Sequence, residues 1–260
     1  TLRDVRRMQA LFEGGKRPLH SLERLLDVGD LSSAEILAGR HIEDLTDHGL
    51  DTLTALRGRS LKELEEFPLL SMLRLVLERA QEEMPVATVE GFARDLQARL
   101  LDDRTEHDPT HQAALLATQI AVDRMLGLWD SALVLSRRAM DMFDDPHGRT
   151  DEERGELPPA LYSAISLTGI LSADYGLAQE AAGRGFWLAS AQDNRLEKVQ
   201  ALALSALSSA LLGNVEEATS YLERLDRLGG HEDLEPYEFG WVNESLARAV
   251  VALHKGDPDE

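Results

Sequence analysis

The chain has 260 residues, of which 43% are hydrophobic and only 5% aromatic, so leucine and alanine must supply most of its core. It carries 47 acidic and 27 basic residues, and a net charge of −20 excludes nucleic-acid binding over most of its surface. The absence of cysteine excludes a disulfide framework, thiol catalysis and cysteine-ligated zinc.

The first part of the chain is predicted to form short helices between glycine and proline breaks. We expect these helices at residues 1–12, 19–28, 31–47, 50–56, 69–83 and 86–102. Ser60 and Glu63 have the spacing of a capping box, which predicts a short helix that Pro68 limits. The basic N-terminal stretch is either a solvated helix face or a contact with an upstream domain.

The second part has a more regular pattern of paired helices. The expected pairs are 110–126 with 128–143, 158–175 with 177–191, and 195–212 with 214–228, followed by a single helix at 236–255. We therefore predict degenerate helical repeats over 1–104 and more regular repeats, the last one truncated, over 105–260. Loop 144–157 is the longest and most charged connection, where disorder is expected first.

A glycine followed five residues later by an alanine recurs between the predicted helices. The copies are Gly29/Ala34, Gly127/Ala132, Gly176/Ala181 and Gly213/Ala218, and a fifth begins at Gly256. From Gly127 onward the glycines are 49, 37 and 43 residues apart. We expect each glycine to adopt a left-handed conformation that ends one helix, and each alanine to let the next helix pack closely.

Seven residues before the last three of these glycines the sequence has a small residue, where two helices would cross. These residues are Gly169, Ala206 and Ala249, whereas the earlier copies have Ile120 and Leu22. The pattern resembles tetratricopeptide repeats, most strongly over 160–260. The resemblance implies an all-α fold, a right-handed α-solenoid of irregular tetratricopeptide-like helix pairs.

A second resemblance covers the first part of the chain. Its segments are 25–37 with a Gly-Asp turn, 48–53 with a Gly-Leu helix, the leucine-rich 58–68 ending in proline, and 73–75. This order resembles the region that follows the ATPase and winged-helix parts of MalT-like, ATP-dependent LuxR-type transcription regulators. The resemblance implies that the repeats receive an inducer or a regulatory protein. The chain has no phosphate-binding loop and no basic helix-turn-helix, so those functions would belong to flanking domains.

In such an array the first helix of each pair would line the concave wall. Counting back from the turn glycines gives the candidate wall residues Arg124, Ser163, Ser166, Gln200 and Asn243. With few charges, this wall favours a neutral ligand or an apolar peptide. The alternative is that these side chains contact only the next repeat or water.

Two tryptophans receive separate predictions. Trp187 is also a candidate binding residue, because Gly183 and Gly185 beside it indicate that a neighbouring helix, a ligand or a partner approaches closely. Trp129 follows a turn glycine by two residues and is expected to be buried between paired helices.

Metal sites and catalysis are not expected. Three groups of residues have metal-ligand chemistry: His107 with His111, His41 with His48, and Asp141 with Asp144 and Asp145. Pro109 separates the first two histidines, which we place in a solvated loop. His41 and His48, seven residues apart, could share one face of a helix, but no carboxylate has the spacing to complete a site, and we place both at the surface. The aspartates lack the glycine and the spacing of a calcium loop. No nucleophile elbow is present, and we predict neither an enzyme nor a cofactor.

The sequence thus predicts a non-catalytic sensing region whose partner is a small-molecule inducer, a regulatory protein or a peptide. The alternative is a freestanding scaffold for protein–protein interactions. Without a signal peptide or spanning segment, we expect a cytoplasmic protein that binds neither membranes nor, directly, nucleic acid. The chain looks like an excised piece of a longer protein. Its truncated fifth repeat would leave an apolar face uncovered near Val250 and Leu253, so homo-oligomers formed through the C-terminal helix would be an artefact of the fragment.

Overall fold

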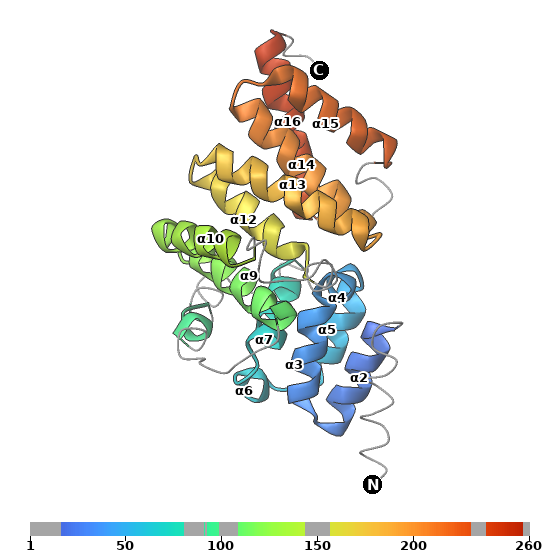
Figure 1. Cartoon of the computed structure of the whole chain (residues 1–260). Helices are drawn as coiled ribbons and strands as arrows, with labels where there is room; N and C mark the ends of the chain where they lie inside the picture. Colours follow the sequence, from blue (N-terminus) through green and yellow to red (C-terminus); the bar gives the residue numbers. More distant parts are fainter. Residues whose placement is uncertain are drawn as a thin grey trace. The chain divides into compact units, whose positions relative to one another are not determined.

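The computed structural model of the chain describes residues 17–80, 91, 93–98, 109–143, 157–229 and 238–256. Within these ranges the regular secondary structure is α-helical and contains no strand (Figure 1). No helix in this part of the chain has the length and apolar character needed to cross a membrane. The all-α prediction is therefore confirmed for the described residues, whereas the basic N-terminal stretch and most of loop 144–157 lie outside them.

The chain divides into two compact units, residues 1–128 and 129–260. The boundary lies between the helices ending at Met125 and beginning at Trp129. The predicted division at 104/105 depended on the regularity of the repeats, which is a different criterion from packing, and it stays a prediction. The two units are described separately below.

The first unit is built from short helices around a leucine core. Its helices are α2 (Pro18–Val28), α3 (Leu31–Arg40), α4 (Ile42–Asp47), α5 (Gly49–Arg57), α6 (Leu61–Leu64), α7 (Pro68–Ala80) and α9 (Pro109–Met125). Leu22, Leu25, Leu53 and Leu69 are almost completely buried in one apolar cluster. Leucine therefore supplies the core of this unit, as its composition predicted.

The single helix predicted over 31–47 is wrong, because the helix breaks at His41. That residue has φ −131° and ψ 30°, and it ends α3 before α4 begins at Ile42. The apolar spacing continues through the break, so periodicity alone could not locate it. His48 precedes α5, and the two histidines therefore lie at helix ends instead of on one helix. His111 also differs from its prediction, since it is buried within α9.

The second unit consists of longer helices, of which α12 with α13 and α14 with α15 form successive antiparallel pairs, while α10 packs on α12 and α16 on α14 (Figure 1). They are α10 (Trp129–Phe143), α12 (Ala160–Leu171), α13 (Tyr175–Ala191), α14 (Arg195–Leu211), α15 (Val215–Arg227) and α16 (Glu238–Lys255). Helix α14 is central and packs against α13, α15 and α16, so every residue from Ala201 to Ala210 is buried. The predicted helices of this unit agree with the observed ones to within a few residues.

The same turn recurs five times in the described part of the chain. One residue takes a left-handed conformation, its N–H bonds to a carbonyl three residues back, and the next N–H bonds to a carbonyl five residues back. The left-handed residues are Gly29, Gly127, Ala173, Asp193 and Gly213. These paired bonds define a Schellman motif, which satisfies carbonyls that the helix end leaves without partners.

The third predicted copy of the turn was displaced by three residues. Ala173, with φ 57°, takes the left-handed conformation there, whereas Gly176 lies inside the first turn of α13. Counted from Ala173, the alanine five residues later is Ala178, which is completely buried. The predicted alanines of the copies, Ala34, Ala132, Ala181 and Ala218, are also completely buried, as expected for close helix packing. The turn at Asp193 differs, because the partly buried Lys198 takes this position.

Trp129 is not a core residue, and its prediction is wrong. It is the first residue of α10 and remains 43% exposed. Three residues later, Ala132 occupies the fully buried position of this turn. A tryptophan at the start of a helix can lie at the edge of the turn, because the alanine one turn further on makes the close contact.

Candidate binding surface

The predicted wall residues have very different surroundings in the structure. Ser166 is completely buried and Asn243 is 5% exposed, whereas Trp187 is 58% exposed. Ser163 and Gln200 are partly buried. Arg124 belongs to the first unit and the other five to the second. Counting back from the turn glycines therefore did not identify residues that are similarly exposed to solvent.

Ser166 faces the partner helix of its own pair. Its hydroxyl donates a hydrogen bond to the Ala178 carbonyl oxygen at 2.8 Å. Counting from Ala173 instead of Gly176 moves Ser166 to the position seven residues before the turn, where two helices cross. Ser163 then takes the position ten residues before the turn.

Ser163 joins the first helices of two successive pairs. Its hydroxyl donates to Glu197 Oε2 at 2.8 Å, which links α12 to α14. Glu197 is only 8% exposed, and its own N–H donates to Asn194 Oδ1 at 3.1 Å. Sequence reasoning missed Glu197, because an Asn-x-x-Glu pattern at a helix start is typical of a solvent-exposed cap.

Gln200 follows Glu197 by one turn on the same side of α14. Its Oε1 atom is buried and has no hydrogen-bond partner in the described part of the chain. A buried acceptor without a donor is unfavourable by about 1–3 kcal/mol, and few occur in native proteins. Ser163, Glu197 and Gln200 are hereafter called the polar row. They place a hydroxyl, a carboxylate and an amide oxygen in one row, and the amide oxygen is the atom without a hydrogen-bond partner among the described residues.

Trp187 lies on α13 close to two glycines, one next to a neighbouring helix and one with open space around it. A Cβ added at Gly185 would lie 3.2 Å from Tyr162 Cβ, so helix α12 makes the close approach there. A Cβ added at Gly183 would have no atom within 4 Å. A neighbouring helix therefore accounts for Gly185, while the indole of Trp187 stays exposed.

Arg124 is partly buried near the end of α9. Loss of solvent lowers the pKa of its guanidinium to about 10. A group with that pKa is still protonated at pH 7, so Arg124 keeps its positive charge under physiological conditions.

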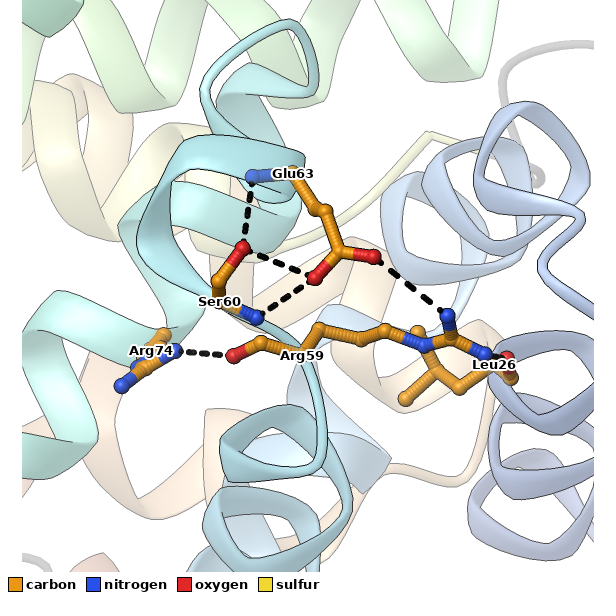
Figure 2. A network of polar contacts seen from close by, with 5 residues as sticks. All are labelled: Leu26, Arg59, Ser60, Glu63 and Arg74. Atoms are coloured by element: carbon orange, nitrogen blue, oxygen red, sulfur yellow. Dashed lines mark hydrogen bonds and ion pairs between the residues drawn. The ribbon is translucent and has the colours of Figure 1, made fainter.

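The polar network around Arg59 is structural (Figure 2). Arg59 donates to the Leu26 carbonyl, and Arg74 Nη1 donates to the Arg59 carbonyl at 2.8 Å. Ser60 Oγ accepts from the Glu63 N–H, and Glu63 Oε2 accepts from the Ser60 N–H, which confirms the predicted capping box. These bonds fix the turn before α6 against α2 and α7.

The described residues contain no cluster of three or more histidine or acidic side chains that could hold a metal ion. His107, Asp144 and Asp145 lie outside the described residues, so the predictions for their groups are not tested here. No protein-family model, curated protein or solved structure matches this chain. In the second unit, the polar row formed by Ser163, Glu197 and Gln200 is the candidate binding surface.

Proposed function

We propose that the chain is the ligand- or partner-sensing repeat region of a MalT-like LuxR-type transcription regulator. In this proposal its helix pairs are irregular tetratricopeptide-like repeats that form a right-handed α-solenoid in the cytoplasm. The recurrent Schellman turn supports the repeat, because it gives successive helix pairs the same local geometry. The region itself is non-catalytic and needs no cofactor, and it leaves nucleotide and DNA binding to other domains.

The observation that carries the sensing role is the unused acceptor in the polar row. Gln200 Oε1 is buried and has no hydrogen-bond partner among the residues that the structure describes, one turn from the buried carboxylate of Glu197. A neutral ligand with hydroxyl or amide groups would supply the missing donor and relieve this unfavourable burial. Ser163 and Glu197 join α12 to α14, so a ligand bound there would contact two successive repeats.

Such a ligand would act by shifting the population of conformers. If α12 and α14 adopt two relative positions, a ligand that bridges the polar row favours the one in which its donors reach both helices. The size of the shift is limited by the difference in the ligand's affinity for the two conformers.

A thermal-shift screen with sugars, nucleotides, lipids and small amide-containing metabolites tests this proposal. We expect at least one neutral, donor-rich compound to raise the melting temperature of the 260-residue chain. Gln200→Leu and Glu197→Gln should each abolish the shift. Glu223→Gln, which makes the same change at an exposed carboxylate of α15, should preserve it. A compound that stabilises all four proteins equally would contradict binding at the polar row.

The second candidate function is a freestanding scaffold for a protein or peptide. It is favoured by apolar side chains that remain exposed on α16, among them Val242, Leu246 and Leu253. The coding sequence on either side of this chain distinguishes the two functions. A phosphate-binding loop upstream and a helix-turn-helix downstream would support the regulator, and their absence from the full gene would favour the scaffold.

A further inference from the structure

Trp187 remains exposed although helices pack against α13 on both sides. Helix α13 contacts α12 within its own pair and α14 of the next pair. Phe186, the residue before it, is partly buried, whereas the indole of Trp187 faces solvent. Because both helix pairs around it are complete, the exposure of this tryptophan does not result from the end of the chain.

Five exposed positions of α13 lie on one side of the helix, at spacings of four, three, four and three residues. They are Gly176, Glu180, Gly183, Trp187 and Ser190. Gly183 precedes Trp187 by one turn, and a Cβ built there would meet no atom within 4 Å. Since helical side chains point back toward the start of the helix, this open space lies next to the indole. A side chain from another molecule could therefore enter it and contact the indole.

Helix α15 continues this surface beside α13. Gln179 Nε2 donates to Glu217 Oε2 at 3.0 Å, and the guanidinium carbon of Arg224 lies 4.7 Å from the centre of the Phe186 ring. These two contacts are seven residues apart on both helices, so α13 and α15 run side by side in the same direction. The exposed residues that α15 adds are Glu216, Ser220, Glu223 and Arg227. Together with the five exposed positions of α13, they are called the α13/α15 face.

The α13/α15 face is acidic. Glu180, Glu216 and Glu223 are exposed on it and Glu217 is exposed where the two helices meet, whereas Arg227 is the one exposed basic residue of α13 and α15. Arg184 pairs with Glu180 at 2.6 Å, and Arg224 lies over the rings of Phe186 and Tyr221. This face therefore attracts cations, and it repels nucleic acid, anionic lipid and a second copy of the acidic chain.

We propose that the α13/α15 face binds a basic segment of a partner protein, and that Trp187 anchors an arginine or lysine of that segment. The cation lies on the face of the indole, whose π electrons attract it, beside the open space at Gly183. Further basic residues of the segment pair with the carboxylates of Glu216 and Glu223. Tryptophan is a frequent anchor of protein interfaces, because it buries a large area at one point. The face lies apart from the polar row and does not depend on a ligand there.

A labelled peptide of alternating arginine and leucine is the probe for this face. Fluorescence anisotropy with the 260-residue chain measures its dissociation constant. The same peptide with citrulline in place of arginine has a similar shape without the charge, and it should bind at least about tenfold more weakly. Raising NaCl from about 0.05 to 0.5 M should also weaken the arginine peptide, because salt screens the attraction.

Trp187→Ala tests the anchor. We expect it to raise the dissociation constant of the arginine peptide by about five- to tenfold. Trp129→Ala is the matched control, since it removes an exposed tryptophan from α10, and it should change the constant by less than about twofold. Trp187→Phe should restore most of the affinity, because phenylalanine keeps an aromatic face for the cation.

Gly183→Leu separates binding from stability. Leucine favours a helix more than glycine does and the position has room, so the melting temperature should not fall. The added side chain nevertheless fills the space beside the indole, and it should weaken the peptide by at least about threefold. Glu223→Gln should weaken the peptide as well, whereas Glu66→Gln removes an exposed charge from the first unit and should not.

The proposal is overturned if the arginine peptide does not bind, if the citrulline peptide binds equally well, or if salt leaves the affinity unchanged. It is also overturned if Trp187→Ala and Gly183→Leu bind the peptide as tightly as the natural chain, because net charge alone would then explain the attraction. Gln200→Leu should keep the full affinity for the peptide. A failure at the α13/α15 face is thus distinguishable from a failure at the polar row.

Discussion

Gly169 and Gly183 both lie inside helices of the second unit, but the space around them differs completely. A Cβ at Gly169 would lie 2.8 Å from both the Ala178 N and the Asp174 carbonyl oxygen, which are backbone atoms and cannot move aside freely. A Cβ at Gly183 would meet no atom within 4 Å. One glycine is therefore required by helix packing, and the other only lowers helix propensity.

We predict opposite effects of alanine at these two positions. Gly169→Ala should destabilise the protein by roughly 1–3 kcal/mol because it forces α12 and α13 apart. Gly183→Ala should stabilise it by about 0.5–1 kcal/mol, since alanine favours the helix and the site has room. Urea unfolding of both variants measures the difference. Equal effects of the same sign would show that the close approach at Gly169 is absent in solution.

Glu35 is a buried carboxylate that caps a helix from a distance. It is 6% exposed, and its two oxygens accept the N–H groups of Leu69 and Leu70 at 2.8 and 3.0 Å. Glu35→Ala should lower the unfolding free energy by about 2–4 kcal/mol, because two buried donors at the start of α7 lose their acceptor. Glu66→Ala, at an exposed position, should change it by less than about 0.5 kcal/mol. A similar small loss for both variants in chemical denaturation would disprove this role.

At the scale of elements, Asp174 connects α10 to the start of α13. Its Oδ2 accepts from Arg137 Nη2 at 2.8 Å, and its Oδ1 accepts from the Leu177 N–H at 3.2 Å. The hydrogen bond from Arg137 contributes most to lowering the pKa of Asp174, and the bond from Leu177 adds to it. The carboxylate form is therefore more stable in the folded protein than in the unfolded chain.

This shift predicts the direction of a pH effect. Because the folded pKa of Asp174 is below its unfolded value, the stabilisation is complete above the unfolded pKa and disappears as the pH falls through the folded pKa. Arg137→Gln should raise the pKa of Asp174 toward its ordinary value, as NMR titration of the side-chain carboxyl would detect. The Arg137 side chain is 59% exposed and that of Asp174 28%, so solvent screens the pair and the loss of stability at pH 7 should stay below about 1 kcal/mol. Lys198→Gln should leave this titration unchanged, since Lys198 pairs with Asp193.

The helices were largely predictable from sequence, and the turns explain both the success and the errors. Glycine at positions 29, 127 and 213 marked helix ends correctly, because only the turn conformation favours that residue there. In the third copy, Ala173 takes the left-handed conformation instead of a glycine. Because Gly176 follows three residues later, the glycine pattern predicted the turn at the wrong residue. That displacement assigned Ser166 to an exposed wall, although its hydroxyl is used inside its own helix pair. The buried role of Glu197 depends on the distance between α12 and α14, which no local pattern contains.

For the whole molecule, the acidic surface sets the response to salt. A chain with a net charge of −20 repels itself when compact, and salt at 0.1 M screens the repulsion between charges more than about 10 Å apart. We therefore predict that the melting temperature rises between about 20 and 300 mM NaCl. MgCl2 at equal ionic strength should raise it at least as much. A melting temperature that falls over this range would show that attractive ion pairs, such as Arg74 with Glu78, outweigh the net repulsion.

The left-handed turns at Ala173 and Asp193 offer a route to a more heat-resistant protein. For residues other than glycine this conformation is unfavourable by roughly 1–2 kcal/mol, so both turns store strain that glycine would release. Ala173 is the cleaner position to change, because Asp193 also holds an ion pair with Lys198. Ala173→Gly should raise the urea midpoint, with a net gain below about 1 kcal/mol after the greater entropy of the unfolded chain is included. An engineer could thus stabilise the second unit at a turn, without touching either the polar row or the α13/α15 face.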